Sequence, residues 1–483
     1  MGLSLLRTKP LATLLHDTTG EKHLRRALGP WDLTALGIGC IIGVGIFVLP
    51  GVQAAKNAGP GIILSFAIAA AACACSALCY AELAAMIPVA GSAYTYGYAT
   101  LGELPAWIIG WDLILEYMVA AVLVSTGWSA YLVNLLHQAG VELPHAICAS
   151  PWDSPPGRFN LPAVAIVVLL SALLIRGIKE SSRVNFVIVV VKLAVVVFFI
   201  VLAGRHVDAR NWTPFMPFGF KGVMTAAAIV FLAYVGFDAV STAAEEAKNP
   251  QRDMPIGIMG SLAVATVLYM AVAAIMTGVV PYARLGVADP VALVLNELGM
   301  RWSSAVISVG AIGGITSVLL VLLLGQPRIL FSMSRDGLLP PFLSSVHARY
   351  RTPYLTTIAT GTIVSVAAAL TPIDVSSALC SIGTLFAFLI VCAGVIVLRR
   401  TRPDLERPFR VPLFPLLPAL GVVLCAYLMV SLPGTAWVRF VVWLVIGLMI
   451  YFGYGIRRSK VASRERAGVR APGSEEAGAD ISS

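Results

Sequence analysis

Long apolar runs recur along the whole chain, and they constrain its fold more than any other feature. Short polar stretches separate twelve such runs, which lie near 31–56, 61–87, 104–135, 161–178, 184–203, 222–247, 255–280, 303–333, 354–371, 377–398, 412–432 and 435–456. A helix that crosses a bilayer needs roughly 20 apolar residues. The pattern therefore predicts an all-α integral membrane protein with twelve transmembrane helices.

The composition excludes the soluble classes of protein. Apolar residues make up 58% of the chain and charged residues 12%, whereas charged residues are about 25% of a typical soluble domain. So little charge cannot cover a soluble surface, and the lipid bilayer is the expected surrounding. The first 30 residues are polar and basic, so no cleavable signal peptide is expected.

The basic residues are distributed unevenly between the two sides of the predicted membrane. Of the 34 Lys and Arg residues, 25 fall on the side that holds both termini. By the positive-inside rule we expect a multi-pass plasma membrane protein with both termini in the cytoplasm. The net charge of +9 then reflects topology, and no nucleic acid partner is expected. Residues 1–30 are expected to form a cytoplasmic segment and 457–483 a disordered tail.

Two of the apolar runs carry glycine interruptions at corresponding places. The first run reads GIGCIIGVGIF at 37–47, and the sixth reads FLAYVGFD at 231–238. Each opens a block of five predicted helices, 31–203 and 221–398, and an odd number of spans inverts the second block relative to the first. Such matched interruptions are typical of a transporter site at the membrane midplane. The alternative is close helix packing through small residues.

Four segments resemble the amino acid–polyamine–organocation (APC) permeases. Residues 37–47 resemble the signature of the first helix of that superfamily, and 81–96 resemble its second and third helices. Residues 233–252 are similar to the cationic amino acid transporter branch and its bacterial relatives, and the residues from 325 to 337 agree with that branch. The resemblance spans about 28–456. It implies a LeuT-type 5+5 inverted repeat with broken helices 1 and 6, helices 11 and 12 at 412–456 outside the repeat, and amino acid transport by alternating access.

The breaks offer backbone groups to the constant parts of an amino acid. N–H groups near Gly43, Val44 and Gly45 can bind a carboxylate. Carbonyl groups at the other break can accept from the α-ammonium, and glycine there lets a ligand approach the backbone. The residues predicted at this second break are Phe231, Leu232, Ala233 and Gly236. In the family a Thr or Ser often stands where Val44 is, so we expect backbone contacts to the carboxylate rather than a hydroxyl contact.

An apolar wall is predicted for the substrate side chain. Gly314, Val318 and Leu322 recur at helical spacing on one face, and Ile41 and Phe231 are expected to complete the wall. No acidic residue stands on that face to meet a guanidinium group. We therefore expect small or medium neutral amino acids rather than Arg or Lys. The alternative is that this face packs against another helix.

Lys192 lies deep inside an apolar run, where a charge is costly. One interpretation is a lysine that is paired for structure alone. The other is an ammonium that replaces a coupling sodium ion, since LeuT-type transporters hold sodium with carbonyls of the unwound helix 1 and hydroxyls of helix 8. Thr316 and Ser317 supply such hydroxyls, and 37–40 the carbonyls. A lysine of helix 5 in the bacterial relatives is associated with proton coupling, and Lys192 matches that position.

Further carboxylates stand in or near the apolar runs. Glu116 is interpreted as a gate or a second proton site, or as a carboxylate bonded to a neighbouring helix, and Asp112 one turn earlier is given no role. Three others near cytoplasmic helix ends are expected to pair with Arg335 or Lys248. They are Glu82, Glu245 and Glu246.

No sequence feature indicates catalysis. The six histidines lie in loops or at helix ends, and no metal-ligand spacing or nucleophile–base pair is visible. The cluster Cys73, Cys75 and Cys79 is interpreted as small helix filler. We therefore expect no enzyme activity, no cofactor and no bound metal.

Three functions stay open within the transporter class. The first is proton-coupled, sodium-independent uptake, in which the amino acid and protons are the partners. The second is an amino acid exchanger, which often lacks the lysine of helix 5. The third is an amino-acid-sensing receptor with slow transport, against which the lack of a long cytoplasmic signalling domain counts. A small membrane subunit or a second copy of the chain is a further candidate partner.

Overall fold

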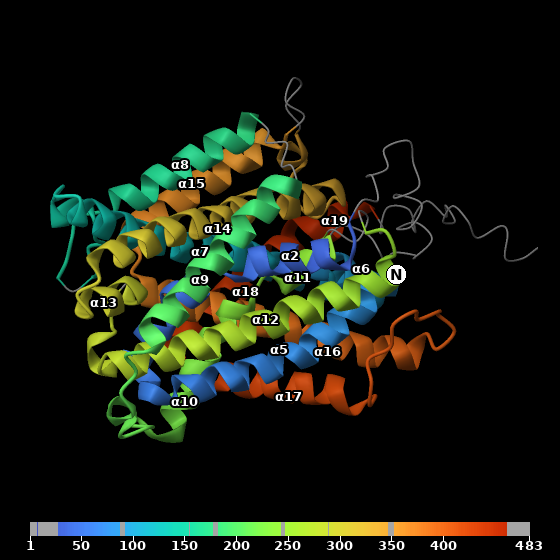
Figure 1. Ribbon diagram of the computed structural model, residues 1–483. Coiled ribbons are helices and arrows are strands. Elements are labelled where there is room, and N and C mark those ends of the chain that lie inside the picture. The colour runs from blue at the N-terminus through green and yellow to red at the C-terminus, as the bar shows by residue number, and fades with distance from the viewer. Residues whose placement is uncertain are drawn as a thin grey trace, which may run out of the picture.

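The computed structural model describes Arg7 and the ranges 28–86, 92–153, 155–176, 182–242, 247–287, 289–345 and 352–460 (Figure 1). Within these ranges the chain is helical, and its only β pairing is two isolated bridges. The α-helices are α2 (Pro30–Ile41), α3 (Val44–Phe47), α4 (Leu49–Gln53), α5 (Ile62–Met86), α6 (Ser92–Thr100), α7 (Glu103–Gln138), α8 (Leu161–Arg176), α9 (Ser182–Gly204), α10 (Gly219–Val230), α11 (Phe237–Thr242), α12 (Pro250–Val279), α13 (Pro290–Glu297), α14 (Arg301–Arg335), α15 (Tyr354–Leu370), α16 (Ile373–Thr401), α17 (Leu416–Val430), α18 (Gly434–Ile450) and α19 (Ile456–Arg458).

The all-helical expectation is confirmed, because every predicted apolar run is occupied by a helix or by several helical segments in succession. By length and composition, six helical stretches of the described chain can cross a membrane: Leu49–Met86, Glu103–Gln138, Pro250–Val279, Arg301–Arg335, Val375–Thr401 and Gly434–Arg458. Shorter apolar helices are Leu161–Arg176, Val189–Gly204, Gly219–Tyr234, Tyr354–Leu370 and Leu416–Val430. The count of twelve spans and the inverted repeat stay predictions.

A proline and an acidic residue stabilise the first turns of α12 and α2. At the start of α12, Pro250 occupies the first turn, where its missing N–H costs no hydrogen bond, and the carboxylate of Asp253 accepts from the N–H of Asn249 at 3.1 Å. The start of α2 repeats this, with Pro30 in its first turn and Asp32 accepting from the N–H of Gly29 at 2.9 Å. Both acidic groups also complement the positive end of the helix dipole.

The helices form an inner group and an outer group. α7 packs against α14 and α16, and α12 packs against α2 and α5, so these helices enclose the centre of the protein. α8 and α15 lie side by side at one edge of the view, and α10 and α17 near the opposite edge (Figure 1). Outer helices expose apolar side chains that lipid tails can cover, among them Val168, Val366, Val423, Val430 and Val438.

The connections contain two short helices, α6 and α13, which lie between the predicted spans. The expected pairing of Glu82 with Arg335 or Lys248 is wrong, because its buried carboxylate accepts from Nε of Arg399 at 2.9 Å instead. Glu245 and Glu246 lie outside the described residues.

Candidate functional site

The first helix breaks inside the protein, at Ile42 and Gly43. α2 ends at Ile41, Ile42 is extended, and α3 begins at Val44. The N–H groups of Gly43, Val44 and Gly45 lie at the start of α3, where the helix offers them no acceptor. The last carbonyl groups of α2 likewise have no N–H donor from a following helical turn. Residues 37–50, which include the break, are buried throughout. The break therefore presents hydrogen-bond donors on one side and acceptors on the other.

A second break follows α10. The chain tightens into a 3₁₀ turn over Phe231–Tyr234, extends at Val235 and passes through Gly236 before α11 begins. Gly236 has a φ of 121°, which side chains other than glycine rarely adopt. A Cβ atom there would lie 2.9 Å from the carbonyl carbon of Cys40. Only glycine lets the two interrupted segments come this close.

The two breaks lie against each other. A Cβ atom on Gly45 would lie 2.7 Å from Cα of Ala233. The hydroxyl of Tyr269, on α12, lies 2.8 Å from the carbonyl oxygen of Ile41 and 2.7 Å from that of Ala233. A hydroxyl carries one proton, so it can donate fully to only one of the two carbonyls at a time. The second carbonyl keeps a free lone pair for a ligand.

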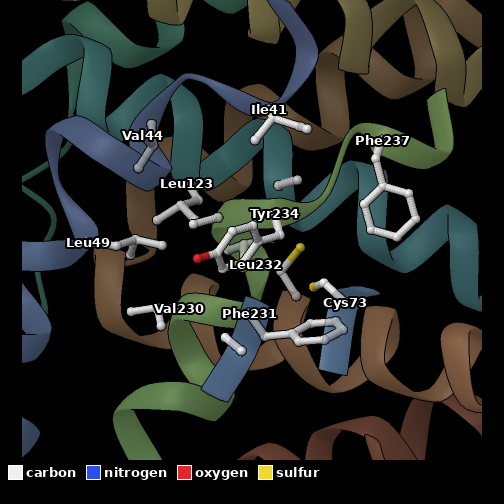
Figure 2. Packing of buried hydrophobic residues seen from close by; sticks show 14 of the residues in the cluster. Ile41, Val44, Leu49, Cys73, Leu123, Val230, Phe231, Leu232, Tyr234 and Phe237 are labelled. Atoms are coloured by element: carbon white, nitrogen blue, oxygen red, sulfur yellow. The ribbon is translucent and has the colours of Figure 1, made fainter. Parts of the chain in front are cut away.

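The predicted substrate-binding residues of both breaks are brought together. Figure 2 shows Ile41 and Val44 beside the first break, with Phe231, Leu232 and Tyr234 of the second segment below them. The side chains of these five residues are buried. They form part of one apolar cluster that closes around the breaks.

The residues of α14 that were predicted to form the apolar wall face two different neighbours, the first break and Lys192. Val318 faces the first break, since a Cβ atom on Gly43 would lie 3.0 Å from its Cγ2. Leu322 lies one turn further along α14 and is partly buried against the same cluster. Gly314, one turn earlier, lies against Lys192 and so takes no part in the wall. The apolar wall is therefore shorter than predicted.

Lys192 reaches the carbonyl groups that the first break leaves free. Its side chain is 1% exposed, and Nζ donates to the carbonyl oxygens of Gly39 at 2.7 Å and Ile42 at 3.2 Å. In an unbroken helix the carbonyl of Ile42 would accept from the N–H of Ile46, but that N–H donates to Gly43 instead. The lysine thus takes the place of the missing helical donors.

The hydroxyl groups expected beside Lys192 bond elsewhere in this structure. Thr316 accepts from Nε1 of Trp128 at 2.9 Å and donates to the carbonyl of Ile312 at 2.6 Å. Ser317 donates to the carbonyl of Gly314 at 2.9 Å. The ammonium group is therefore hydrogen-bonded to the first break, and the lysine meets α14 through packing of its stem.

A second group of buried charges lies on α7. Asp112 is fully buried, neither of its carboxylate oxygens has a hydrogen-bond partner in the described chain, and Gly383 of α16 lies against it. Glu116 is also buried and interacts electrostatically with Asp238 at the start of α11. An unpartnered ionised carboxylate is costly at this depth. Glu116 therefore stays a candidate proton site.

Tyr269 is the residue of the site that the sequence did not indicate. Its only signal is a hydroxyl within the apolar run 255–280, and the same signal is given by many tyrosines that simply fill a core. No group of three or more His, Cys, Asp and Glu side chains in the described ranges is arranged to hold a metal ion.

Comparison with known proteins identifies the family of the chain. The family model described as "Amino acid permease" matches residues 28–454. The branched-chain amino acid permease BcaP of Bacillus subtilis (strain 168) is 52% identical over 95% of this chain and 99% of its own, and the methylthioribose transporter of the same organism is 48% identical over 94% and 99%. The vacuolar cationic amino acid transporter 4 of Arabidopsis thaliana is 38% identical over 83% of this chain and 68% of its own. The chain therefore belongs to the amino acid permease family of the APC superfamily, and cationic amino acid transporters are among its homologues.

Proposed function

We propose that this permease takes up neutral aliphatic L-amino acids by alternating access, with protons as the coupling ion and without sodium. The observation that carries the proposal is the junction of the two breaks, with the Lys192 ammonium bonded to the carbonyls of Gly39 and Ile42. Backbone donors, backbone acceptors and one titratable cation meet there in a buried site.

The backbone of the two breaks supports a pose for the substrate. The carboxylate would accept from the N–H groups at Gly43, Val44 and Gly45, and the positive helix end there favours an anion. The α-ammonium would donate to the carbonyl of Ala233, which now shares the Tyr269 hydroxyl. Each constant group of an amino acid then meets backbone of opposite character.

The surroundings of the breaks support a neutral, aliphatic side chain. Val318 and Phe231 are apolar and lie against the breaks, and neither of them offers a carboxylate to a cationic side chain. The 52% identity to a permease named for branched-chain amino acids favours the same class. Leucine, isoleucine and valine are therefore the first substrates to test.

The position of Lys192 supports proton coupling. Its ammonium group donates to carbonyl groups of the broken first helix. In LeuT-type transporters the carbonyl groups of the broken helix bind the sodium ion instead. Loss of the proton would remove the cation and loosen the tie between α9 and the first break. Binding from the outside would use the protonated form, and release of the proton into the cytoplasm would favour the inward-open state.

Uptake into proteoliposomes tests the proposal. Labelled leucine, valine, alanine and arginine are offered without sodium, with and without an inward proton gradient. We expect leucine and valine to accumulate only with the gradient and to compete with each other. Strong arginine uptake that alanine and valine do not reduce would overturn the assigned substrate class. Accumulation without internal substrate would exclude an obligate exchanger. Net accumulation would exclude the amino-acid-sensing receptor with slow transport.

A second candidate substrate is methylthioribose, because one relative at 48% identity is named for its transport. This thiosugar has neither a carboxylate nor an ammonium group, so the backbone groups at Gly43 and Ala233 would meet hydroxyls. The same liposomes distinguish the two substrates: inhibition of leucine uptake by excess methylthioribose, with methylthioribose itself accumulated, would favour this second candidate.

A further inference from the structure

The stem of Lys192 lies directly across a glycine of α14. A Cβ atom on Gly314 would lie 3.1 Å from Cγ, 3.5 Å from Cδ and 3.4 Å from Cε of the lysine. Three consecutive methylene groups thus border the space that a side chain at position 314 would occupy. The ammonium group at the end of this stem donates to the carbonyls of Gly39 and Ile42.

Neighbouring glycines show which face of α14 makes this contact. A Cβ atom on Gly310 would lie 2.3 Å from Cγ2 of Val195, which is one turn after Lys192 on α9. A Cβ atom on Gly313 would meet nothing within 4 Å. Glycines four residues apart let two helices approach closely. Gly310 and Gly314 therefore form the face toward α9, and Gly313 points away from it.

We propose that Gly314 is a positioning residue for the coupling proton, because its lack of a side chain sets how far the Lys192 ammonium reaches toward the carbonyls of the first break. The inference rests on the proposed proton coupling and deepens it. In this proposal α14 positions the lysine by packing against its stem, whereas the sequence predicted a hydrogen bond from Thr316 or Ser317.

The hydrogen-bond distances make the site sensitive to a small displacement. Nζ lies 2.7 Å from the oxygen of Gly39 and 3.2 Å from that of Ile42, and the longer distance is already at the upper end of the usual range. A methyl group at position 314 is close enough to push the stem by a few tenths of an ångström. Of the described residues, the thiol of Cys40 on α2 is the titratable group that interacts electrostatically with Lys192.

The test is the pH profile of leucine uptake by Gly314→Ala in sodium-free proteoliposomes. Weaker hydrogen bonds to the protonated lysine lower its proton affinity, so uptake should need a more acidic exterior. We expect the half-maximal external pH to fall by about one unit, a tenfold change that matches the removal of about one hydrogen bond to a charged group. Exchange of internal for external leucine at a fixed acidic pH should stay within about threefold of the wild type, because the backbone groups that bind leucine are unchanged.

Two matched variants separate positioning from packing. Gly313→Ala makes the same chemical change on the open face and should leave the pH profile unchanged. Gly310→Ala disturbs the packing of α9 on α14 beside an uncharged valine, and it should lower activity without moving the half-maximal pH. If Gly314→Ala keeps the wild-type half-maximal pH, or if Gly310→Ala shifts it equally, Gly314 is a packing residue and the inference is wrong.

Lys192→Met distinguishes failure of the inference from failure of the proposed function. If this variant accumulates leucine with the wild-type pH dependence, proton coupling through Lys192 fails, and the role of Gly314 fails with it. If Lys192→Met loses the pH dependence while Gly314→Ala keeps it unchanged, only the role of Gly314 fails. Should Gly314→Ala not fold, it is combined with Val195→Ala, which gives α9 more room, and compared with Val195→Ala alone under the same criterion.

Discussion

Gly236 fixes the geometry of the second break through its backbone. An alanine at this position would be strained at a φ of 121°, and its Cβ would press on the backbone of Cys40. Strain in such a region costs about 1–3 kcal/mol. We expect Gly236→Ala to lower leucine uptake about tenfold or more per folded protein.

The matched control for Gly236→Ala is Gly434→Ala, where an added Cβ meets nothing within 4 Å. It should transport at the wild-type rate. Equal uptake by both variants would show that the close approach of the two breaks is not required for transport.

The Tyr269 hydroxyl holds the carbonyls of Ile41 and Ala233 at the junction. Tyr269→Phe keeps the ring and removes this donor, so the two carbonyls together lose one shared hydrogen bond worth about 1 kcal/mol. We expect the KM for leucine to rise about fivefold, since that energy corresponds to a factor of about five. An unchanged KM, measured as initial uptake against leucine concentration, would show that these carbonyls do not bind the substrate.

At the residue scale, the sequence predicted the backbone groups of both breaks but not their supports. Gly43 and Gly236 are recognisable because glycine is needed where a helix is interrupted. Tyr269 and the contact of Gly314 with Lys192 join segments far apart in the chain. Such contacts depend on how helices pack, and one sequence does not reveal which helices meet.

At the scale of helices, one buried ion pair joins α5 to α16 and to the segment that follows α16. Glu82 accepts from two nitrogens of Arg399 and, at 2.7 Å, from the N–H of Val411, and Arg407 lies 3.7 Å away. Removing one partner of a buried pair costs about 3–5 kcal/mol. We therefore expect Glu82→Gln to lower the Tm in detergent clearly.

An exposed ion pair provides the control for that prediction. Arg284 and Glu297 lie 2.6 Å apart, with side chains 59% and 34% exposed. Exposed pairs contribute about 0–1 kcal/mol, so Glu297→Gln should leave the Tm nearly unchanged. A Tm of Glu82→Gln as high as that of Glu297→Gln would contradict the structural role of the buried pair.

The helices themselves were predicted well, because each apolar run is long and the breaks carry glycine. The short helices α6 and α13 were missed, since neither is long enough to give a clear periodic signal. The partner of Glu82 was also missed, because Arg399 is 317 residues away and closer basic residues were equally plausible by charge alone.

For the whole molecule, the open prediction is orientation in the membrane. The segment between α7 and α8 and the segment between α16 and α17 lie at opposite ends of the helices in Figure 1. Cys148 on the first segment is partly exposed, whereas the other seven cysteines are buried. A Cys148→Ser background therefore suits labelling with an impermeant thiol reagent.

In that background we expect a reagent added to intact cells to label Trp152→Cys and not Pro403→Cys, because the positive-inside rule places both termini in the cytoplasm. Both positions are exposed, so permeabilised cells should give labelling of both as the positive control. Labelling of Pro403→Cys alone in intact cells would reverse the orientation.

Proton coupling through Lys192 is the central claim, and Lys192→Met tests it most directly, because methionine keeps the bulk of the stem and cannot bind a proton. The measurement compares, in one preparation of sodium-free proteoliposomes, leucine accumulation under an inward proton gradient with exchange of internal for external leucine. We expect the variant to retain exchange but to accumulate no leucine at any external pH. Accumulation with the wild-type pH dependence would contradict coupling through Lys192, and Glu116 would become the next carrier to test.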